Sequence, residues 1–182
     1  MTNKFEEKTI ATTQIFNGKI IKLQLDEVTL PNGETSKREI IKHPGAVAVI
    51  AVTDDNKILF VEQYRKPLEK SLVEIPAGKL EADEKPEITA KRELEEETGY
   101  TTDKLELVTS FYTSTGFADE LLYIYYTDKL MPLKEKKALD EDEFVELMEL
   151  TLEEAESLMI EKKIHDAKTV YAITYLQHLL KK

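Results

Sequence analysis

One stretch of the chain, residues 78–100, constrains the fold more than any other because it predicts a loop, a helix and a tight turn in succession. Pro86 suits the first turn of a helix, and Gly99 suits the position just past its end. The residues between them favour helix, so this spacing predicts a helix over residues 86–98. Any fold of this chain must therefore accommodate an acidic helix that directly follows a loop.

The predicted helix carries a group of glutamates with a defined orientation. Successive helical residues advance by about 100°, which places Glu93, Glu96 and Glu97 on one face and Glu95 on the other side. Carboxylates crowded on one face repel each other, and hard divalent cations offset that repulsion because they prefer oxygen ligands. Arg92 can pair with one of these carboxylates. We therefore expect a metal-binding face, with Glu95 as a solvated surface charge outside it.

Composition limits the chemistry that this helix can serve. The chain has 182 residues and a formal net charge of −11, which disfavours a nucleic-acid backbone or an anionic membrane as the main partner. It has no cysteine, which excludes a disulfide scaffold, a zinc–thiolate site and a thiol nucleophile. Residues 1–10 lack an apolar signal-peptide core, and the apolar runs are too short to span a bilayer. We expect a soluble, cytoplasmic protein.

Residues 1–43 have the pattern of a small antiparallel β-meander. Strands are predicted at 9–16, 19–30 and 36–42. Asn17-Gly18 suits a type I′ turn between the first two, and Pro31-Asn32-Gly33 marks the next turn. A sheet of this size is marginally stable alone, so it must pack on the rest of the chain or on another subunit.

Residues 44–182 alternate strand patterns with helix patterns. The capping box that begins at Thr151 and ends at Glu154 predicts the start of a helix, and the last helix is expected from about residue 166 to residue 180. Strands are predicted at 46–53, 57–64, 71–75, 105–111, 120–127 and 143–150. The chain is thus assigned to the α/β (α+β) class, with one domain at 1–43 and a second at 44–182.

The glycines and charged residues of the first stretch follow a long, specific spacing. From Gly78 to Tyr100 it is Gly-x5-Glu-x7-Arg-Glu-U-x-Glu-Glu-x-Gly-U, where U is apolar. This spacing resembles the Nudix box at every specified polar and glycine position, with Tyr100 as the last apolar residue. Nearly the whole chain is similar to the ADP-ribose pyrophosphatase branch of that family. The supporting segments are 37–39, 43–46, 62–65, 74–78, 114–120 and 140–144.

The Nudix resemblance implies a fold, a reaction and a metal site. The fold is an α/β/α sandwich with a mixed sheet. The reaction is Mg²⁺-dependent hydrolysis of the pyrophosphate bond of ADP-ribose to AMP and ribose 5-phosphate, with Mn²⁺ as the alternative ion. The expected metal ligands are Glu93, Glu96, Glu97, Glu143 and the backbone carbonyl of Ala77. The expected structural residues of the box are Gly78, Glu84, Arg92 and Gly99.

The resemblance also implies residues outside the box. A carboxylate on the loop at 140–143 is expected to act as general base or metal ligand, with Glu143 as the metal ligand and Glu141 as the alternative base. Arg38 and Arg65 are expected to bind the substrate, and Glu120 its sugar. The N-terminal sheet is expected to be exchanged between two subunits of a homodimer and to complete the nucleotide pocket.

One residue departs from the family pattern. Thr115 stands where the family usually has a proline that marks ADP-ribose specificity, so the exact substrate is left open. A pyrophosphatase for another nucleotide sugar, or for a dinucleotide, is the first alternative. A non-catalytic nucleotide-binding regulator is disfavoured because the box glutamates are all present. A calcium-binding structural protein is disfavoured because no EF-hand spacing occurs.

Overall fold

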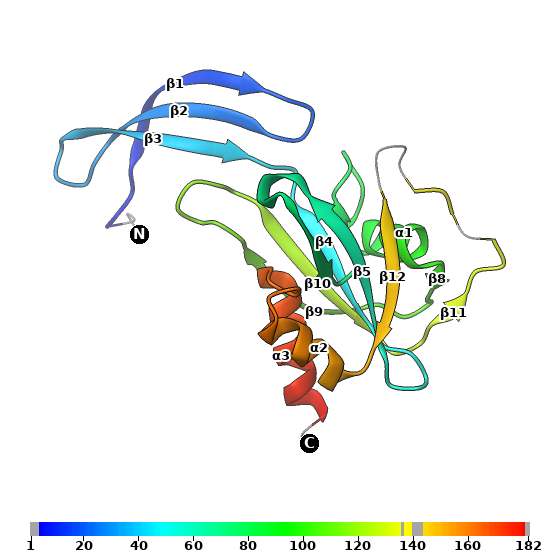
Figure 1. The fold of residues 1–182 in the computed structure, drawn as a ribbon. Helices are drawn as coiled ribbons and strands as arrows, with labels where there is room; N and C mark the ends of the chain where they lie inside the picture. The colour runs from blue at the N-terminus through cyan, green and yellow to red at the C-terminus, as the bar shows by residue number, and fades with distance from the viewer. Residues whose placement is uncertain (1–3, 136, 140–143, 181–182) are drawn as a thin grey trace. The chain divides into compact units, whose positions relative to one another are not determined.

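The computed structural model describes residues 4–135, 137–139 and 144–180 (Figure 1). Its elements, in order, are β1 Lys8–Asn17, β2 Lys22–Thr29, β3 Thr35–Lys42, β4 Ala46–Ala51, β5 Ile58–Arg65, η1 Lys66–Leu68, β6 Lys70–Glu74, β7 Ala77–Lys79, α1 Pro86–Thr98, β8 Tyr100–Thr101, β9 Glu106–Tyr112, β10 Leu121–Thr127, β11 Met131–Pro132, β12 Val145–Leu150, α2 Leu152–Ile160 and α3 Ala167–Leu180. These elements divide into two compact units. The first comprises Met1–Gly45 and Phe111–Leu122, and the second comprises Ala46–Ser110 and Tyr123–Lys182. The domain boundary between residues 43 and 44 stays a prediction.

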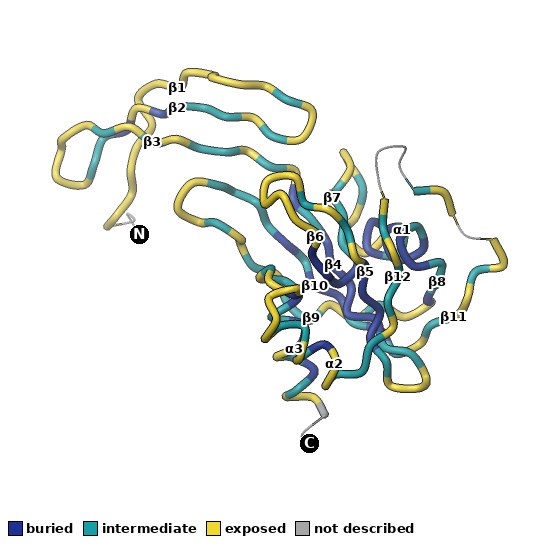
Figure 2. Tube along the Cα trace, viewed as in Figure 1, coloured by how far each residue is buried: buried dark blue, intermediate teal, exposed yellow. Residues whose placement is uncertain are grey.

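The first unit contains the predicted antiparallel meander, in the order β1-β2-β3. Its strand β2 buries Asp26, whose carboxylate accepts hydrogen bonds from Thr12 at 2.7 Å and from Gln24 at 3.0 Å. The end of β3 binds the 114–119 segment, because Asp119 accepts a hydrogen bond from the Lys42 ammonium at 2.8 Å. Strand β1, by contrast, is exposed along its whole length (Figure 2).

A hairpin joins β1 and β2 at the predicted place, but the predicted type I′ turn at Asn17-Gly18 is wrong. Strand β1 ends at Asn17 and β2 begins only at Lys22, so the connection has four residues rather than two. The Gly18 N–H donates to the carbonyl of Ile21 at 2.9 Å, and the φ of Gly18 is not positive. An added Cβ at Gly18 would lie 2.4 Å from the ring of Phe16, so the glycine accommodates a side-chain contact there.

The second unit is a sheet assembly covered by helices on both faces. Its strands form the orders β7-β4-β10-β9 and β12-β5-β6. On one face, Val47 and Val49 of β4 pack with Ala90 and Leu94 of α1 in a single apolar cluster. Adjacent strand residues point to opposite faces, and Tyr126 of β10 meets Tyr175 of α3 edge-on at a centroid distance of 6.2 Å. Figure 1 shows β4, β5 and β10 between α1 and the α2–α3 pair. The α/β/α sandwich is confirmed.

The helix boundaries follow the signals in the sequence. Helix α1 begins at Pro86, and Gly99 ends it in the left-handed conformation with a φ of 76°. Helix α2 has the predicted capping box, in which the Thr151 hydroxyl accepts from the Glu154 N–H at 3.2 Å and the Glu154 carboxylate accepts from the Thr151 N–H at 2.8 Å. Among the described residues, no helix is both long and apolar enough to cross a membrane.

Candidate active site

Helix α1 presents two buried glutamates to the short strand β7. Its apolar residues Ala90 and Leu94 are fully buried in the core, which fixes the rotation of the helix about its axis. Glu93 and Glu97 are then also buried, with 7% and 3% of their surface exposed. Burial of carboxylates is costly unless charged or hydrogen-bonding groups compensate for it. The contacts of these two side chains therefore define the site.

Glu93 packs directly on the backbone of Gly78. A Cβ added to Gly78 would lie 1.9 Å from both Cδ and Oε1 of Glu93, which is far inside van der Waals contact. The φ of Gly78 is not in the left-handed region. Glycine is thus required here because of the close approach of the carboxylate and not because of the backbone conformation.

Glu97 binds the adjacent peptide. Its Oε2 accepts a hydrogen bond from the Ala77 N–H at 2.9 Å. Since Glu93 lies against Gly78 and Glu97 binds Ala77, two glutamates one helical turn apart hold two consecutive residues of β7. This arrangement keeps both carboxylates next to the backbone of the predicted carbonyl ligand.

Arg92 connects three of the other box residues. Its Nη1 donates to Glu93 at 2.9 Å and to Glu96 at 3.0 Å, and its Nη2 donates to Glu84 at 3.2 Å. Burial by itself lowers the pKa of Arg92, but the hydrogen bond to Glu84 and the charge of Glu93 outweigh it and raise the pKa above its ordinary value. Arg92 thus stays charged and offsets the repulsion among these carboxylates.

Glu84 receives a second hydrogen bond, from the hydroxyl of Thr89 at 2.8 Å. Burial raises the pKa of Glu84, whereas the hydrogen bonds from Arg92 and Thr89 lower it, and the net pKa lies below its ordinary value. Glu84 therefore links the segment before α1 to the helix.

The expectation that Glu95 is a solvated surface charge is wrong. Only 8% of Glu95 is exposed, and its carboxylate accepts a hydrogen bond from the Thr101 hydroxyl and forms an ion pair with Lys137. Both partners lie C-terminal to the helix. Glu95 does point away from the Glu93 face, as predicted, but it is a buried anchor for the segments that follow α1.

The donor set around Gly78 fits a hard divalent cation, because carboxylate and carbonyl oxygens are its preferred ligands. Because Gly78 has no Cβ, the Glu93 carboxylate can lie directly against the backbone of β7. Within residues 4–135, 137–139 and 144–180, no three acidic or histidine side chains already converge as a metal cage. Glu93 and Glu96 instead share Arg92, so the carboxylates are held near one another by a guanidinium.

Arg65 lies at the end of β5 and pairs with a residue that the sequence reasoning assigned no role. Its Nε and Nη2 donate to the two oxygens of Glu74 at 2.7 and 2.6 Å. Glu74 is only 2% exposed and also pairs with Lys168 of α3. A charged residue in the otherwise apolar run 72–75 was the available signal for Glu74, but no local pattern identified its partners.

The other predicted substrate residues belong to the first unit. Arg38 forms a two-pronged ion pair with Glu7, with its Nε at 2.8 Å and its Nη2 at 2.6 Å from the carboxylate. Glu120 accepts a hydrogen bond from Thr113. Its carboxylate is 3.6 Å from Nδ1 of His43, and that nitrogen accepts the Gly45 N–H at 3.1 Å. The predicted Glu141 and Glu143 lie outside the described residues.

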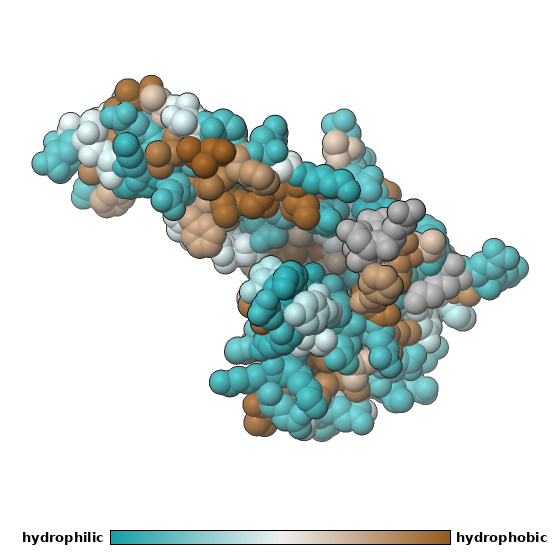
Figure 3. Space-filling model, turned by 45° about the horizontal axis from the view of Figure 1, so that its top comes forward, coloured by the Kyte–Doolittle hydropathy of each residue, from teal (hydrophilic) through white to brown (hydrophobic). Residues whose placement is uncertain are grey.

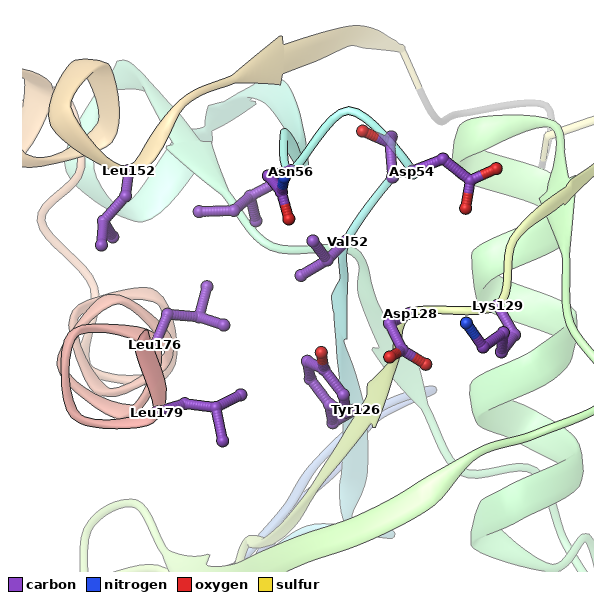
Figure 4. A pocket seen from close by; sticks show the side chains of 11 residues that line it. Val52, Asp54, Asn56, Tyr126, Asp128, Lys129, Leu152, Leu176 and Leu179 are labelled. Carbon is purple, nitrogen blue, oxygen red and sulfur yellow. The ribbon is translucent and has the colours of Figure 1, made fainter. Parts of the chain in front are cut away.

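A separate pocket of about 210 Å³ lies among the β4–β5 turn, the end of β10, α2 and α3 (Figure 4). Leu152, Leu176 and Leu179 point into it from the helices, and Tyr126 and Asp128 face them from β10 and its end. It has no lining residue in common with the box. Its volume is below the roughly 300 Å³ at which small-molecule sites usually begin. The buried carboxylates of Glu93 and Glu97 beside β7 are the better candidate site because they supply the oxygen ligands that a divalent cation prefers.

Comparison with known families places this site in context. Residues 42–172 match the NUDIX domain, and residues 7–41 match the nucleoside diphosphate sugar hydrolase N-terminal domain. The first match spans more than half of the chain. It includes Arg92 and the glutamates around it, which are Glu84, Glu93, Glu96 and Glu97. The chain therefore belongs to the Nudix family of hydrolases.

Individual relatives cover nearly the whole chain. It is 63% identical over 172 residues to an ADP-ribose pyrophosphatase of Bacillus subtilis (strain 168), covering 94% of this chain and 93% of that protein. It is 62% identical over 177 residues to a methanol dehydrogenase activator of Bacillus methanolicus, covering 97% and 96%. A solved structure of an ADP compounds hydrolase superposes with a TM-score of 0.84, covering 97% of this chain and 95% of that one. At 18% identity, that likeness supports the fold alone.

Proposed function

We propose that this Nudix hydrolase cleaves the pyrophosphate bond of ADP-ribose to give AMP and ribose 5-phosphate, with Mg²⁺ as cofactor and Mn²⁺ as the alternative. The observation that carries the proposal is the packing of the Glu93 carboxylate on Gly78, with Glu97 bound to the neighbouring N–H of Ala77. Further support comes from the 63% identity to a protein named ADP-ribose pyrophosphatase.

In this proposal, Glu93, Glu97 and the Ala77 carbonyl hold the metal, with Glu96 as a further ligand. With Mg²⁺ bound by these residues, the site would gain charge that offsets the pyrophosphate and would activate water for attack. Arg92 contributes by keeping Glu93 in place through its 2.9 Å hydrogen bond.

Substrate binding and proton transfer fall to residues outside the box. Arg65 and Arg38 bind the substrate, and Glu120 binds its sugar portion. The general base is a carboxylate within residues 140–143. Glu143 is the predicted metal ligand there and Glu141 the alternative base. Positioning and charge stabilisation supply most of the acceleration in phosphoryl transfer, so these groups need not form covalent intermediates.

The first test is the release of AMP from ADP-ribose by the purified protein with Mg²⁺. We expect Glu97→Gln to lower kcat about 100-fold, because it removes a charged ligand worth several kcal/mol of transition-state stabilisation. The amide oxygen of the replacement can still accept the Ala77 N–H, so the loop should keep its position. If the wild type releases no more AMP than Glu97→Gln, the chain does not have this activity, and a non-catalytic nucleotide-binding role becomes the better reading.

The second test concerns the substrate and uses Thr115→Pro. The Ser114 carbonyl accepts the Phe117 N–H at 3.1 Å, so Thr115 is the second residue of a turn, a position that suits proline. The variant should therefore fold. We expect it to raise the kcat/KM ratio of ADP-ribose over other nucleoside diphosphate sugars and dinucleotides, measured across a substrate panel. An unchanged ratio would mean that Thr115 does not set the sugar preference, and a higher wild-type rate on another substrate would favour that substrate.

We also propose a homodimer that exchanges its N-terminal sheets. Strand β1 is exposed along its whole length, and Ile10, Ile15 and Phe16 are each more than half exposed. Figure 3 shows apolar surface over the N-terminal strands. Such a surface on a marginal sheet favours coverage by a second copy. Light scattering should give twice the chain mass of 20.9 kDa, and a mass of 20.9 kDa would contradict the exchange. The cytoplasmic location and the absence of a nucleic-acid partner remain predictions.

A further inference from the structure

The buried carboxylate of Glu74 pairs with two cationic side chains, those of Arg65 and Lys168. It accepts hydrogen bonds from Nε and Nη2 of Arg65 and from the ammonium group of Lys168. Only 2% of Glu74 is exposed, whereas 38% of the Arg65 side chain is exposed. The Nε and Nη2 groups are therefore held by a buried anion, although more than a third of the Arg65 side chain is exposed.

The strand register shows in which direction the Arg65 side chain must run to pair with Glu74. Arg65 is the last residue of β5, but Glu74 lies opposite Val61, four residues earlier in that strand. The guanidinium is therefore drawn back over the sheet instead of extending from the strand end into solvent. Among the described residues, Nη1 of Arg65 has no hydrogen-bond partner, so this edge is left for another group.

Arg65 is also within electrostatic reach of the candidate metal site. Its hydrogen bonds to Glu74 raise the pKa of Arg65, burial opposes that change, and the negative charge of Glu97 adds to the increase. Glu97 is the residue that binds the Ala77 N–H at the start of β7. Strand β5, which ends at Arg65, also packs against α1 through Leu59 and Leu94, so Arg65 and the α1 glutamates are carried by neighbouring elements.

Helix α3 holds Glu74 from its other side. Lys168 pairs with Glu74 and also donates to Asp166 at 2.9 Å. The hydroxyl of Thr169 accepts the N–H of Ile75, the residue that follows Glu74, at 3.1 Å. The carboxylate and its backbone are both fixed by the start of α3, so Glu74 has little freedom to follow Arg65 if that side chain moves.

From this geometry we infer that Glu74 is a positioning residue, which with Lys168 fixes the guanidinium of Arg65 so that its free edge contacts the diphosphate of the substrate. This inference rests on the proposed function. A planar guanidinium suits this role because it can bind a carboxylate through one edge and a phosphate oxygen through another. Glu74 touches neither substrate nor metal, and it acts only through Arg65.

A double-mutant cycle tests the inference, because a residue that acts only through another loses its effect when that other residue is absent. We expect Arg65→Met and Glu74→Gln each to lower kcat/KM for ADP-ribose, by about 100-fold and about 30-fold. In the Arg65→Met background, Glu74→Gln should lower it by less than about 3-fold. The dissociation constant for ADP-ribose in EDTA should follow the same non-additive pattern, which a purely structural role for Glu74 would not produce.

Two further variants keep the test decisive. Glu69→Gln makes the same chemical change in the exposed Lys66 pair and should leave both constants unchanged. If Glu74→Gln does not fold, Glu74→Gln/Lys168→Gln replaces it, since that variant removes one negative and one positive charge. Effects that multiply in the cycle would overturn the positioning role while leaving the proposed function intact. A wild type that does not hydrolyse ADP-ribose would overturn both.

Discussion

Replacement of Gly78 by alanine is expected to lower kcat for ADP-ribose hydrolysis about 1000-fold while the protein stays folded. The added Cβ would lie 1.9 Å from the carboxylate of Glu93, and two heavy atoms cannot occupy that separation. The clashing atoms are at the far end of a flexible side chain, so the fold relieves the clash by moving that carboxylate. The substitution should therefore lower activity more than stability, because the site loses a predicted metal ligand and the Glu93–Arg92 hydrogen bond.

A second glycine provides the opposite control. Gly33 lies in the turn before β3 with a φ of 89°, and a Cβ added there meets no atom within 4 Å. Gly33→Ala should therefore strain the backbone, lowering the free energy of unfolding by about 1 kcal/mol, and leave kcat unchanged. Urea unfolding and AMP release, measured on both variants, should separate the two effects. Full activity in Gly78→Ala would mean that the position of Glu93 does not matter for the reaction.

Local patterns were sufficient to predict most of the fold. The helix over residues 86–98 has the predicted boundaries because Pro86 and Gly99 act through backbone geometry within one turn of each end. The capping box at Thr151 depends only on residues three apart. The exception is Gly18, which lies against the ring of Phe16 two residues earlier and does not adopt the positive φ that the dipeptide favours.

The site was predictable only where its residues lie in one continuous segment. The spacing of the box identified Glu93 and Glu97 together with the loop that they hold. It could not reveal that Glu95 is buried, because its partner Lys137 lies 42 positions away in the sequence. It also gave no role to Glu74, whose buried charge depends on Lys168 in the last helix. Ion pairs between distant segments leave no periodic signal.

Loss of Arg92 should lower stability because this residue is the common partner of three carboxylates. It donates hydrogen bonds to Glu84, Glu93 and Glu96, and its side chain is only 24% exposed. Arg92→Met keeps much of the apolar stem but leaves three partly buried carboxylates without their common cation. We expect the free energy of unfolding at pH 7 to fall by about 2 kcal/mol in the absence of divalent metal. Lys91→Met, which breaks an exposed pair with Asp103, should cost less than about 0.5 kcal/mol.

The pH dependence of this loss distinguishes lost charge pairing from lost packing. Hydrogen bonds from Arg92 and Thr89 outweigh burial and hold the folded-state pKa of Glu84 below its ordinary value of 4.5. A carboxyl group with a lowered pKa contributes stability that is present above pH 4.5 and disappears as the pH falls through its folded-state pKa. The difference in unfolding free energy between wild type and Arg92→Met should therefore be largest at neutral pH and shrink below pH 4.5. Saturating Mg²⁺ should also reduce it, because a bound cation can replace part of the missing charge. A difference that is independent of both pH and Mg²⁺ would show that Arg92 contributes packing rather than charge.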